Sequence, residues 1–220
     1  MSLDARAEVL ARIRAALEST DARGSRAIAA SPASPLDNIE KIAPGELCSR
    51  FAAELTAVSG EAVIVGEPGS DALANAVAEH IERAGYAAIA VQAEPLALQA
   101  ASKIPPARLI DLSKSSIEDL EKADCAIVAA ESLIADTGSA VVRLATYEDR
   151  LLPYLPPACI IVARTSTIVS SLTLAALAAR EAERGERVII TGPSRTGDIE
   201  KTVVLGAHGP GSVVVFVAEV

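Results

Sequence analysis

The chain has 220 residues, and its 29 acidic and 20 basic side chains give it a formal net charge of -9. A protein that grips nucleic acid through the phosphates needs a basic surface, so this charge balance argues against that class. Stacking of bases on aromatic side chains is also excluded, because aromatic residues make up 2% of the sequence and Trp is absent. Half of the residues are hydrophobic, which predicts a main globular domain with its own core.

Three cysteines stand far apart in the sequence, at Cys48, Cys125 and Cys159. Their odd number and wide spacing argue against a disulfide framework and against a zinc or iron–sulfur site within this chain. The two histidines, His80 and His208, are too few for a His-rich metal cluster. We therefore expect buried thiols in a reducing compartment, no metal and no intrinsic cofactor.

The N-terminus carries no basic stretch that leads into an apolar core, so we expect no secretory signal. A membrane span needs a run of about 18 apolar residues, and none occurs. The most apolar stretch, 151–163, is interrupted by Pro153, Pro156 and Pro157. These observations predict a cytoplasmic protein without a membrane span.

The first 44 residues differ in character from the rest of the chain. Leucine and isoleucine recur near helical spacing over 3–17, between acidic and basic side chains, which predicts an amphipathic helix. We expect this helix to dock in cis or in a homo-oligomer, or to bind a partner. Prolines and serines recur over 24–44 and predict a linker. The predicted organisation is a helical arm with linker over 1–44 and an α/β domain over 45–220.

Regular secondary structure is predicted from residue 45 onward, with helices where apolar residues follow helical spacing and strands where they form short runs. Strands that are apolar throughout predict a sheet covered on both faces, and the helices between them predict βαβ crossovers. The expected fold class is α/β, a three-layer open sheet covered by helices, with an N-terminal helical arm. In chain order we expect a helix at 45–58, a strand at 62–65, a helix at 71–84, strands at 86–91 and 109–112, a helix at 117–122, strand segments at 125–129, 133–135, 140–144 and 159–162, a helix at 170–184, and strands at 187–190 and 213–217.

The stretch 191–200 (TGPSRTGDIE) is predicted to lead from a strand through a glycine-bounded loop into a short helix that Thr196 or Asp198 would cap. Backbone N–H groups of such a loop can cradle an anion, and Arg195 offers a fork of donors to phosphate or carboxylate. An ordinary P-loop is excluded, because Asp198 and Ile199 stand where Lys and Ser or Thr are required. The competing interpretation is a plain strand–loop–helix connection with a surface arginine.

A second motif, Asp136-Thr137-Gly138-Ser139, stands between two apolar segments. Asp136 is a candidate acid, base or nucleophile, and Ser139 is a candidate ligand for a substrate oxygen. Asp, Gly and Ser are also ordinary turn residues, so a simple hairpin turn is the alternative.

A third motif, Gly-Ala-His-Gly-Pro-Gly at 206–211, precedes the last predicted strand. His208 is the better placed of the two histidines for acid–base chemistry, because a loop at a sheet edge is accessible. The sequence contains no GxGxxG dinucleotide fingerprint after a strand, no Gly-x-Ser-x-Gly elbow and no His-Glu-x-x-His helix.

In their order and context, the three motifs resemble those of the LUD-domain family, in particular its lactate-utilisation protein C group. The resemblance rests on residues 135–139, 192–200 and 208–210 and covers most of the chain after the N-terminal arm. Ser139 stands where the family often has Thr, and Gly197 stands where it often has Ala.

The resemblance implies a fold similar to the NagB/RpiA/CoA-transferase superfamily and a role in oxidising L-lactate to pyruvate beside iron–sulfur subunits. It follows that iron–sulfur clusters are expected only in those partner proteins. We predict a subunit or accessory protein of a lactate-utilisation system with a pocket for a small anionic metabolite. The alternatives are an independent enzyme acting on a phosphorylated, nucleotide or CoA-linked metabolite, and an interaction module that docks through its N-terminal helix.

The predicted pocket combines two catalytic candidates with a set of ligand-binding residues. Asp136 or His208 would move a proton, and Arg195 would hold a carboxylate or phosphate. This pocket requires Asp136 and His208 to lie close together. The expected ligand-binding residues are Thr137, Gly138, Ser139, Gly192, Pro193, Ser194, Arg195, Thr196 and Gly209.

Overall fold

The computed structural model of the chain describes residues 8–15, 42–66, 71–181, 186–197, 203–206 and 208–219, with the backbone alone at 180–181, 196–197 and 203–205. The chain divides into two compact units, Met1–Asn38 and Ile39–Val220. In the first unit, residues 8–15 form a helix inside the range predicted as helical. Most of the predicted linker lies outside the described residues.

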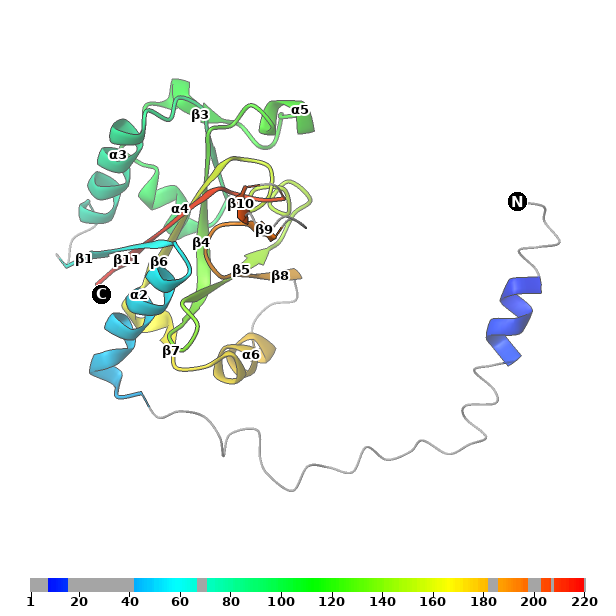
Figure 1. Cartoon of the computed structure of the whole chain (residues 1–220). Helices are drawn as coiled ribbons and strands as arrows, with labels where there is room; N and C mark the ends of the chain where they lie inside the picture. Colours follow the sequence, from blue (N-terminus) through cyan, green and yellow to red (C-terminus); the bar gives the residue numbers. More distant parts are fainter. Residues whose placement is uncertain are drawn as a thin grey trace. The chain divides into compact units, whose positions relative to one another are not determined.

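The second unit holds the elements labelled in Figure 1. Most of the expected elements are present, whereas α4, β7 and the pair β9–β10 were not predicted. The helices and 3-10 turns are η1 (Pro44–Glu46), α2 (Leu47–Ala57), α3 (Ala72–Ala84), α4 (Pro95–Ala100), η2 (Pro106–Arg108), α5 (Ile117–Leu120), η3 (Thr165–Thr167) and α6 (Leu172–Glu181). The strands are β1 (Glu61–Val65), β2 (Ile89–Val91), β3 (Leu109–Ile110), β4 (Cys125–Ile134), β5 (Ser139–Leu144), β6 (Ala158–Arg164), β7 (Ile168–Val169), β8 (Glu186–Ile190), β9 (Arg195–Gly197), β10 (Val203–Leu205) and β11 (Ser212–Ala218).

Six strands form a parallel sheet in the order β1-β11-β6-β4-β2-β3. The long strand β4 continues beyond this sheet, where it pairs in parallel with β7 and antiparallel with β5, and β8 adds to β5. The pairing register shifts between Ala130 and Ser132, so Glu131 forms a β-bulge. The two strand segments predicted at 125–129 and 133–135 are therefore one strand that is interrupted in register at Glu131.

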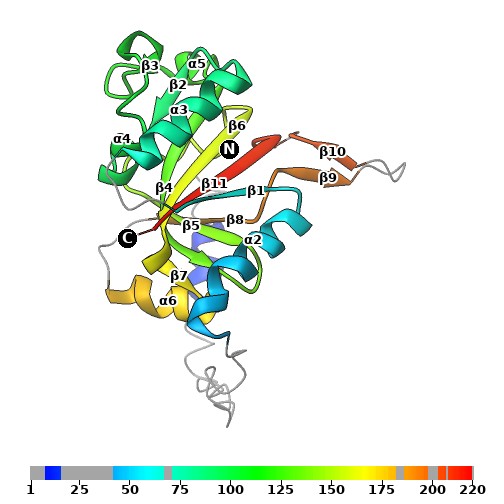
Figure 2. The ribbon, with the colours of Figure 1, turned by 90° about the vertical axis from the view of Figure 1, so that its left-hand side faces the viewer.

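Both faces of the parallel sheet are covered, as its continuous apolar strands predict. Successive side chains of a strand point to opposite faces, so Cys125 and Ile127 of β4 pack with α3 and α4, whereas Ala126 and Val128 pack with α2. Figure 2 shows α3 and α4 on one side of the strands and α2 on the other. The mixed α/β class is confirmed, and beside α2 the second face is covered by the irregular segment 145–157.

Strand β2 is shorter than the strand predicted at 86–91. Strand β2 begins at Ile89 rather than at residue 86, because the Asp124 carboxylate accepts the N–H groups of Ala87 and Ala88 at 2.7 and 2.9 Å. These donors are then not available to the sheet.

Of the two starts predicted for a short helix after the loop, the one at Thr196 is wrong, because residues 195–197 form strand β9 and pair antiparallel with β10. The run Val203–Leu205 gives this segment a strand partner. Tertiary pairing thus overrides the local capping signal, and the second proposed cap, Asp198, lies outside the described residues.

Candidate functional site

The Asp136–Ser139 motif is the tight turn between β4 and β5, as expected for two adjacent strands. Ile134 and Ser139 face each other across the antiparallel pair, and Gly138 adopts a left-handed φ of 62°. The backbone N–H of Asp136 donates to Ser170 O at 3.1 Å, which ties the start of the turn to the segment before α6. The motif is therefore fixed at the end of β4, between β7 on one side and β5 on the other.

Three hydroxyl groups connect this turn to Thr191, the residue that follows β8. Thr137 Oγ1 lies 2.8 Å from Ser139 Oγ, which in turn lies 2.8 Å from Thr191 Oγ1. Ser139 is buried, and its hydroxyl is satisfied by these two neighbours. In this structure Ser139 thus serves to join the first two motifs.

Two motif glycines lie against the C-terminal end of helix α2. A Cβ on Gly138 would come within 2.2 Å of Leu55 N, and one on Gly192 within 2.8 Å of Val58 O. Both glycines also have left-handed φ angles, 62° and 74°. Close packing on a helix therefore accounts for glycine at both positions, independently of any ligand.

The 191–200 stretch and the third motif, at 206–211, are held together by backbone hydrogen bonds. Ser194 N donates to Pro210 O at 2.8 Å, and Gly206 N donates to Ser194 O at 2.9 Å. A Cβ on Gly209 would lie only 3.3 Å from Ser194 Cβ, so the two loops are in close contact. The loops around Ser194 and Gly209, distant in sequence, form one surface.

These two loops border a hollow of about 150 Å³, called here the motif hollow. It contains four of the predicted site residues, Gly192, Ser194, His208 and Gly209, and His208 is exposed. The complete lining is Pro153, Tyr154, Val188, Ile189, Ile190, Thr191, Gly192, Ser194, His208, Gly209 and Pro210.

Arg195 is exposed on β9 and donates from Nη2 to Ser59 Oγ at 2.6 Å, just after α2. It is therefore not at a helix N-terminus, and it does not belong to the lining of the motif hollow. Pro193 is buried beside Gly192, and nothing of the Thr196 side chain lies within the described residues.

The structure does not place Asp136 with His208 in the motif hollow. The lining of the hollow includes none of the residues Asp136–Ser139. Asp136 instead approaches the start of α6, where its Oδ1 and Ser171 Oγ are buried atoms that lack hydrogen-bond partners among the described residues. The three motifs are thus linked, but the two proposed catalytic side chains lie in different surroundings.

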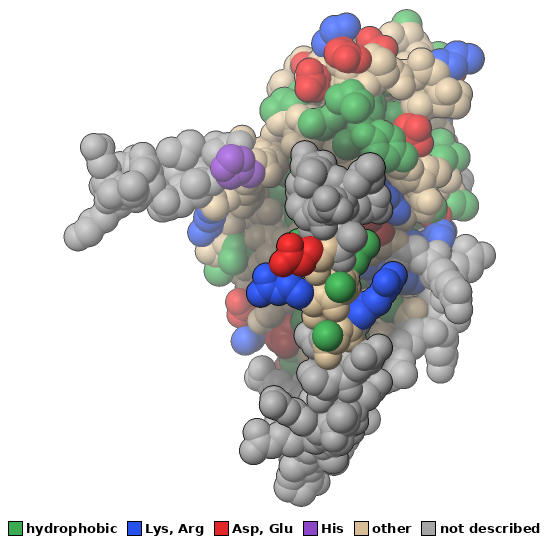
Figure 3. All heavy atoms as spheres, turned by 90° about the vertical axis from the view of Figure 1, so that its right-hand side faces the viewer, with side chains coloured by type: hydrophobic (Ala, Val, Ile, Leu, Met, Phe, Trp, Pro, Cys, Tyr) green, Lys and Arg blue, Asp and Glu red, His purple; other side chains and the backbone are tan. Residues whose placement is uncertain are grey.

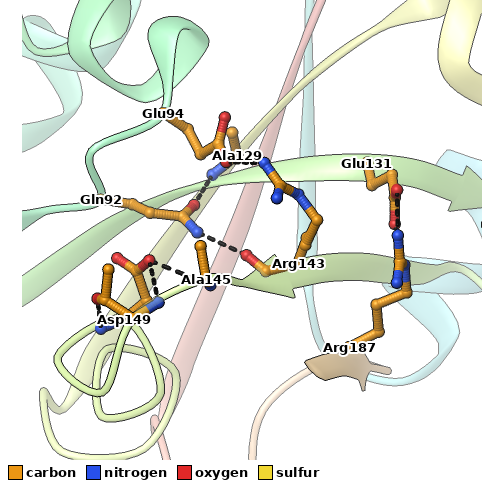
Figure 4. Close-up of polar contacts among 9 residues, drawn as sticks. Gln92, Glu94, Ala129, Glu131, Arg143, Ala145, Asp149 and Arg187 are labelled. Atoms are coloured by element: carbon orange, nitrogen blue, oxygen red, sulfur yellow. Dashed lines mark hydrogen bonds and ion pairs between the residues drawn. The ribbon is translucent and has the colours of Figure 1, made fainter. Parts of the chain in front are cut away.

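A second polar site, which sequence reasoning missed, lies after the carboxyl end of β2 and beside the bulge of β4 at Glu131. Its hollow measures about 130 Å³ and is called here the carboxyl-edge pocket. Arg143 Nη2 donates to Glu94 Oε1 at 2.6 Å, and Arg187 binds Glu131 through Nε and Nη2 at 2.5 and 2.8 Å (Figure 4). The pocket is lined by Glu94, Ala129, Ala130, Glu131 and Arg143. The sequence signals for it are the charged side chains of Glu131 and Arg143, each within an otherwise apolar stretch.

Burial shifts the pKa of several groups outside these hollows. It raises the pKa of the Cys159 thiol to about 12 and also raises that of Cys125, and both thiols are buried in the sheet as predicted. Cys48 is only half-buried, and burial together with Glu219 raises its pKa. Burial lowers the pKa of His80, whose ring meets Phe216 edge-on.

The described surface offers no feature typical of a metal centre or a membrane span. Within the described ranges, no three His, Cys, Asp or Glu side chains gather in a group that could hold a metal ion. No helix in the same ranges combines the length and apolar character needed to cross a bilayer. On the face shown in Figure 3, acidic and basic side chains are interspersed, with hydrophobic side chains between them.

Comparison with known proteins identifies the family. The family model described as LUD domain matches residues 13–218. The chain belongs to the LUD-domain family. The fold is similar to that of a solved structure, a DUF162 family protein from Deinococcus radiodurans, with a TM-score of 0.54 at 20% identity over 81% of this chain and 99% of that one.

Curated relatives of this LUD-domain protein match it over part of its length. "Lactate utilization protein C" of Geobacillus kaustophilus is 33% identical over 105 residues, 45% of this chain and 44% of that protein. "Uncharacterized protein YkgG" of Escherichia coli is 36% identical over 110 residues, 47% of this chain and 48% of that protein. The matched stretch thus spans about half the length of these relatives.

Proposed function

We propose that this LUD-domain protein is a non-redox member of a cytoplasmic lactate-utilisation system that works with iron–sulfur partner proteins. The observation that carries the proposal is the similarity to proteins named Lactate utilization protein C, together with the LUD-domain match over 13–218. The three sequence motifs that prompted the resemblance lie on linked turns and loops of one sheet, which supports a shared role.

The cysteines of the chain support the assignment of electron transfer to partners. An iron–sulfur cluster is ordinarily held by four cysteine thiolates, and this sequence has three cysteines. Two of them are buried in the sheet with raised pKa values, which disfavours the thiolate form that binds metals. Oxidation of lactate would therefore pass its electrons to clusters on other proteins.

The motif hollow is the proposed anion pocket. Its support is the contact between two glycine-containing loops, which lets backbone groups approach a ligand closely, and the exposed His208 at its border. Arg195 stands close by in sequence but bonds Ser59, so its part in binding would require that side chain to turn. The bound metabolite is expected to be a small anion.

The partner proposal is tested by purifying the tagged full chain from cells grown on L-lactate. We expect iron–sulfur proteins to co-purify, with iron and acid-labile sulfide present in the assembly and absent from the chain purified alone. Cells grown on glucose provide the control. Purification of the intact chain without any iron–sulfur protein, under lactate growth, would refute the partnership.

The motif hollow also supports a second candidate function: the protein would be an independent enzyme that acts on a phosphorylated, nucleotide or CoA-linked metabolite. Glycine-containing loops beside Ser194 and His208 favour such ligands. A ligand at about 100 times its dissociation constant stabilises a protein by roughly 2.7 kcal/mol, which raises Tm by about 5–10 °C for a domain of this size. The test is a thermal-shift measurement with sugar phosphates, CoA esters and adenine nucleotides on the natural chain and on His208→Ala. A rise in Tm with one of these ligands that is lost in His208→Ala would support this function. A flat response across the panel would count against this function.

A further inference from the structure

Tyr154 is one of the few aromatic residues of the chain, and it lies half-exposed in the motif hollow. The sequence has three Tyr and two Phe and no Trp. Phe51 and Phe216 are buried in the core, whereas Tyr154 is 49% exposed and lines the hollow. A half-exposed aromatic ring at the border of a hollow is a surface on which a flat ligand ring can stack.

The backbone on both sides of Tyr154 is held in place. Tyr154 N and Leu155 N both donate to Leu151 O, at 3.0 and 2.9 Å. The two residues that precede Tyr154, Leu152 and Pro153, are buried. A ligand that stacks on the ring therefore does not have to order this backbone first, which lowers the entropic cost of binding.

The motif hollow lies where three segments of the chain meet, and backbone hydrogen bonds tie these segments together. Gly211 N donates to Pro157 O at 2.9 Å. Ser194 N donates to Pro210 O at 2.8 Å. These bonds join the segment that carries Tyr154, the third motif and the loop after β8. The walls of the hollow are thus fixed relative to one another, as a binding site requires.

The lining of the motif hollow combines apolar surface with polar groups that have no partner. It contains no Asp, Glu, Lys or Arg, and its prolines and branched side chains give it apolar surface. Ser194 and His208 are its polar members beside Thr191. Within the described part of the chain, neither Ser194 Oγ nor the His208 ring has a hydrogen-bond partner. Such a lining suits a ligand with flat apolar faces and hydrogen-bonding groups at its edge.

Nucleobases have this combination of properties. Their faces stack on aromatic side chains, and the groups along their edges form hydrogen bonds. Successive bases of a nucleic acid need a row of aromatic side chains, which the composition excludes, whereas a single nucleotide needs one ring. A protein cavity of about 150 Å³ holds benzene. The motif hollow, at about 150 Å³ and open to solvent, therefore has room for one base but not for a whole nucleotide.

We propose that the motif hollow binds a purine base, stacked on Tyr154, with Ser194 Oγ and the His208 ring bonded to the edge of the base. The ribose and phosphates of the ligand lie outside the hollow. Of the ligand classes named for the second candidate function, adenine nucleotides and CoA esters carry such a base, and sugar phosphates do not. The inference rests on that function because it takes the motif hollow as the ligand site, and it includes no chemical step.

The test is isothermal titration calorimetry on the full chain with adenosine, AMP, uridine and ribose 5-phosphate. Adenosine and AMP should bind with similar dissociation constants of about 1 mM or tighter, because the base makes the contacts. Ribose 5-phosphate has the phosphate without the base and should bind at least about tenfold more weakly than AMP. Uridine should bind more weakly than adenosine, because a pyrimidine covers less of the Tyr154 ring.

Variants at two tyrosines of one segment assign the binding to the Tyr154 ring. Tyr154→Leu should weaken adenosine binding about 5- to 100-fold, whereas Tyr154→Phe keeps a ring and should stay within about threefold of the natural chain. Tyr147→Leu is the matched control, because Tyr147 is exposed but lies outside the lining of the hollow, so the affinity should not change. Denaturation midpoints establish that each variant is folded. Nuclear Overhauser effects between the adenine protons and a tyrosine ring, measured on the natural chain, do not depend on the folding of any variant.

Three results would overturn the proposal. They are the absence of adenosine binding by the folded natural chain, binding of ribose 5-phosphate as tight as that of AMP, and equal effects of Tyr154→Leu and Tyr147→Leu on the affinity for adenosine. Failure here is distinguishable from failure of the second candidate function. Binding of a phosphorylated ligand that His208→Ala abolishes but Tyr154→Leu retains refutes the stacked base alone. Adenosine binding that depends on Tyr154, without turnover of any nucleotide or CoA ester, refutes the enzyme alone.

Discussion

Replacing Gly138 by alanine should destabilise the fold more than the same change at Gly85 or Gly45. Gly138 stands in the turn between β4 and β5 with a φ of 62°, and an added Cβ would lie 2.2 Å from Leu55 N. The left-handed conformation costs an alanine about 1–2 kcal/mol. Ordinary contacts of a Cβ are 3.4–4 Å, so α2 or the turn must also move by about 1 Å, which as overpacking costs about 1–3 kcal/mol more.

Together these terms predict that Gly138→Ala lowers the free energy of unfolding by about 2–5 kcal/mol. For a domain of this size the melting temperature should fall by about 4–20 °C. Urea denaturation followed by circular dichroism measures the free energy, and a thermal scan measures Tm.

Two further glycines separate the backbone term from the packing term. Gly85 has a φ of 72° but no atom within 4 Å of an added Cβ, so Gly85→Ala should lose only about 1–2 kcal/mol. Gly45 has neither constraint, and Gly45→Ala should change stability by no more than about 0.5 kcal/mol. If Gly138→Ala cost no more than Gly85→Ala, the argument that this turn glycine is required by packing on α2 would be refuted.

Three further measurements probe the interior. Gln92→Met should lower the free energy of unfolding, measured by urea denaturation, by about 2–5 kcal/mol, because it leaves Ala129 N–H and Arg143 C=O without the Gln92 amide. A loss under about 1 kcal/mol would contradict the inference that this amide holds β4 and β5 together. In the native chain at pH 8, Ellman's reagent should modify Cys48 and spare Cys125 and Cys159 until urea unfolds the protein, and rapid modification of all three would contradict their burial. Burial raises the pKa of Cys159 from 9.0 to about 12, so above pH 9 the folded state keeps a thiol proton that the unfolded state has lost. The free energy of unfolding should therefore fall as the pH rises above 9, and it should fall less steeply in Cys159→Ala.

Much of the fold follows from the apolar pattern of the sequence. The continuous apolar runs at 159–162 and 213–217 predict strands covered on both faces, and the structure has β6 and β11 there. The helical spacing over 71–84 predicts α3 closely. These elements are specified by their own residues, so a local pattern suffices to find them.

The parts that were missed depend on contacts between distant segments. Residues 195–197 form a strand because β10 lies beside them, although the local sequence indicates a helix start. Glu131 acquires its place through Arg187, and Arg143 through Glu94, and both partners lie far away in the sequence. A local sequence pattern cannot predict such long-range ion pairs.

The candidate site was predicted in its parts but not in its arrangement. The structure brings the loops around Ser194 and Gly209 together, and Ser139 reaches Thr191. The glycines of the motifs were interpreted as ligand-approach positions, yet Gly138 contacts α2. Which motif side chains share a hollow depends on contacts between separate segments: Asp136 N donates to Ser170 O before α6, whereas the loop that carries His208 is bound to Ser194 through Pro210 O.

The central claim, a role in lactate utilisation, is tested most directly by growth. The gene for the chain is deleted in its own organism, and growth on L-lactate is compared with growth on pyruvate, the product of lactate oxidation. The account predicts a growth defect on L-lactate, normal growth on pyruvate, and restoration by the full chain supplied in trans. Equal growth of the deleted and parental strains on L-lactate as sole carbon source would contradict it.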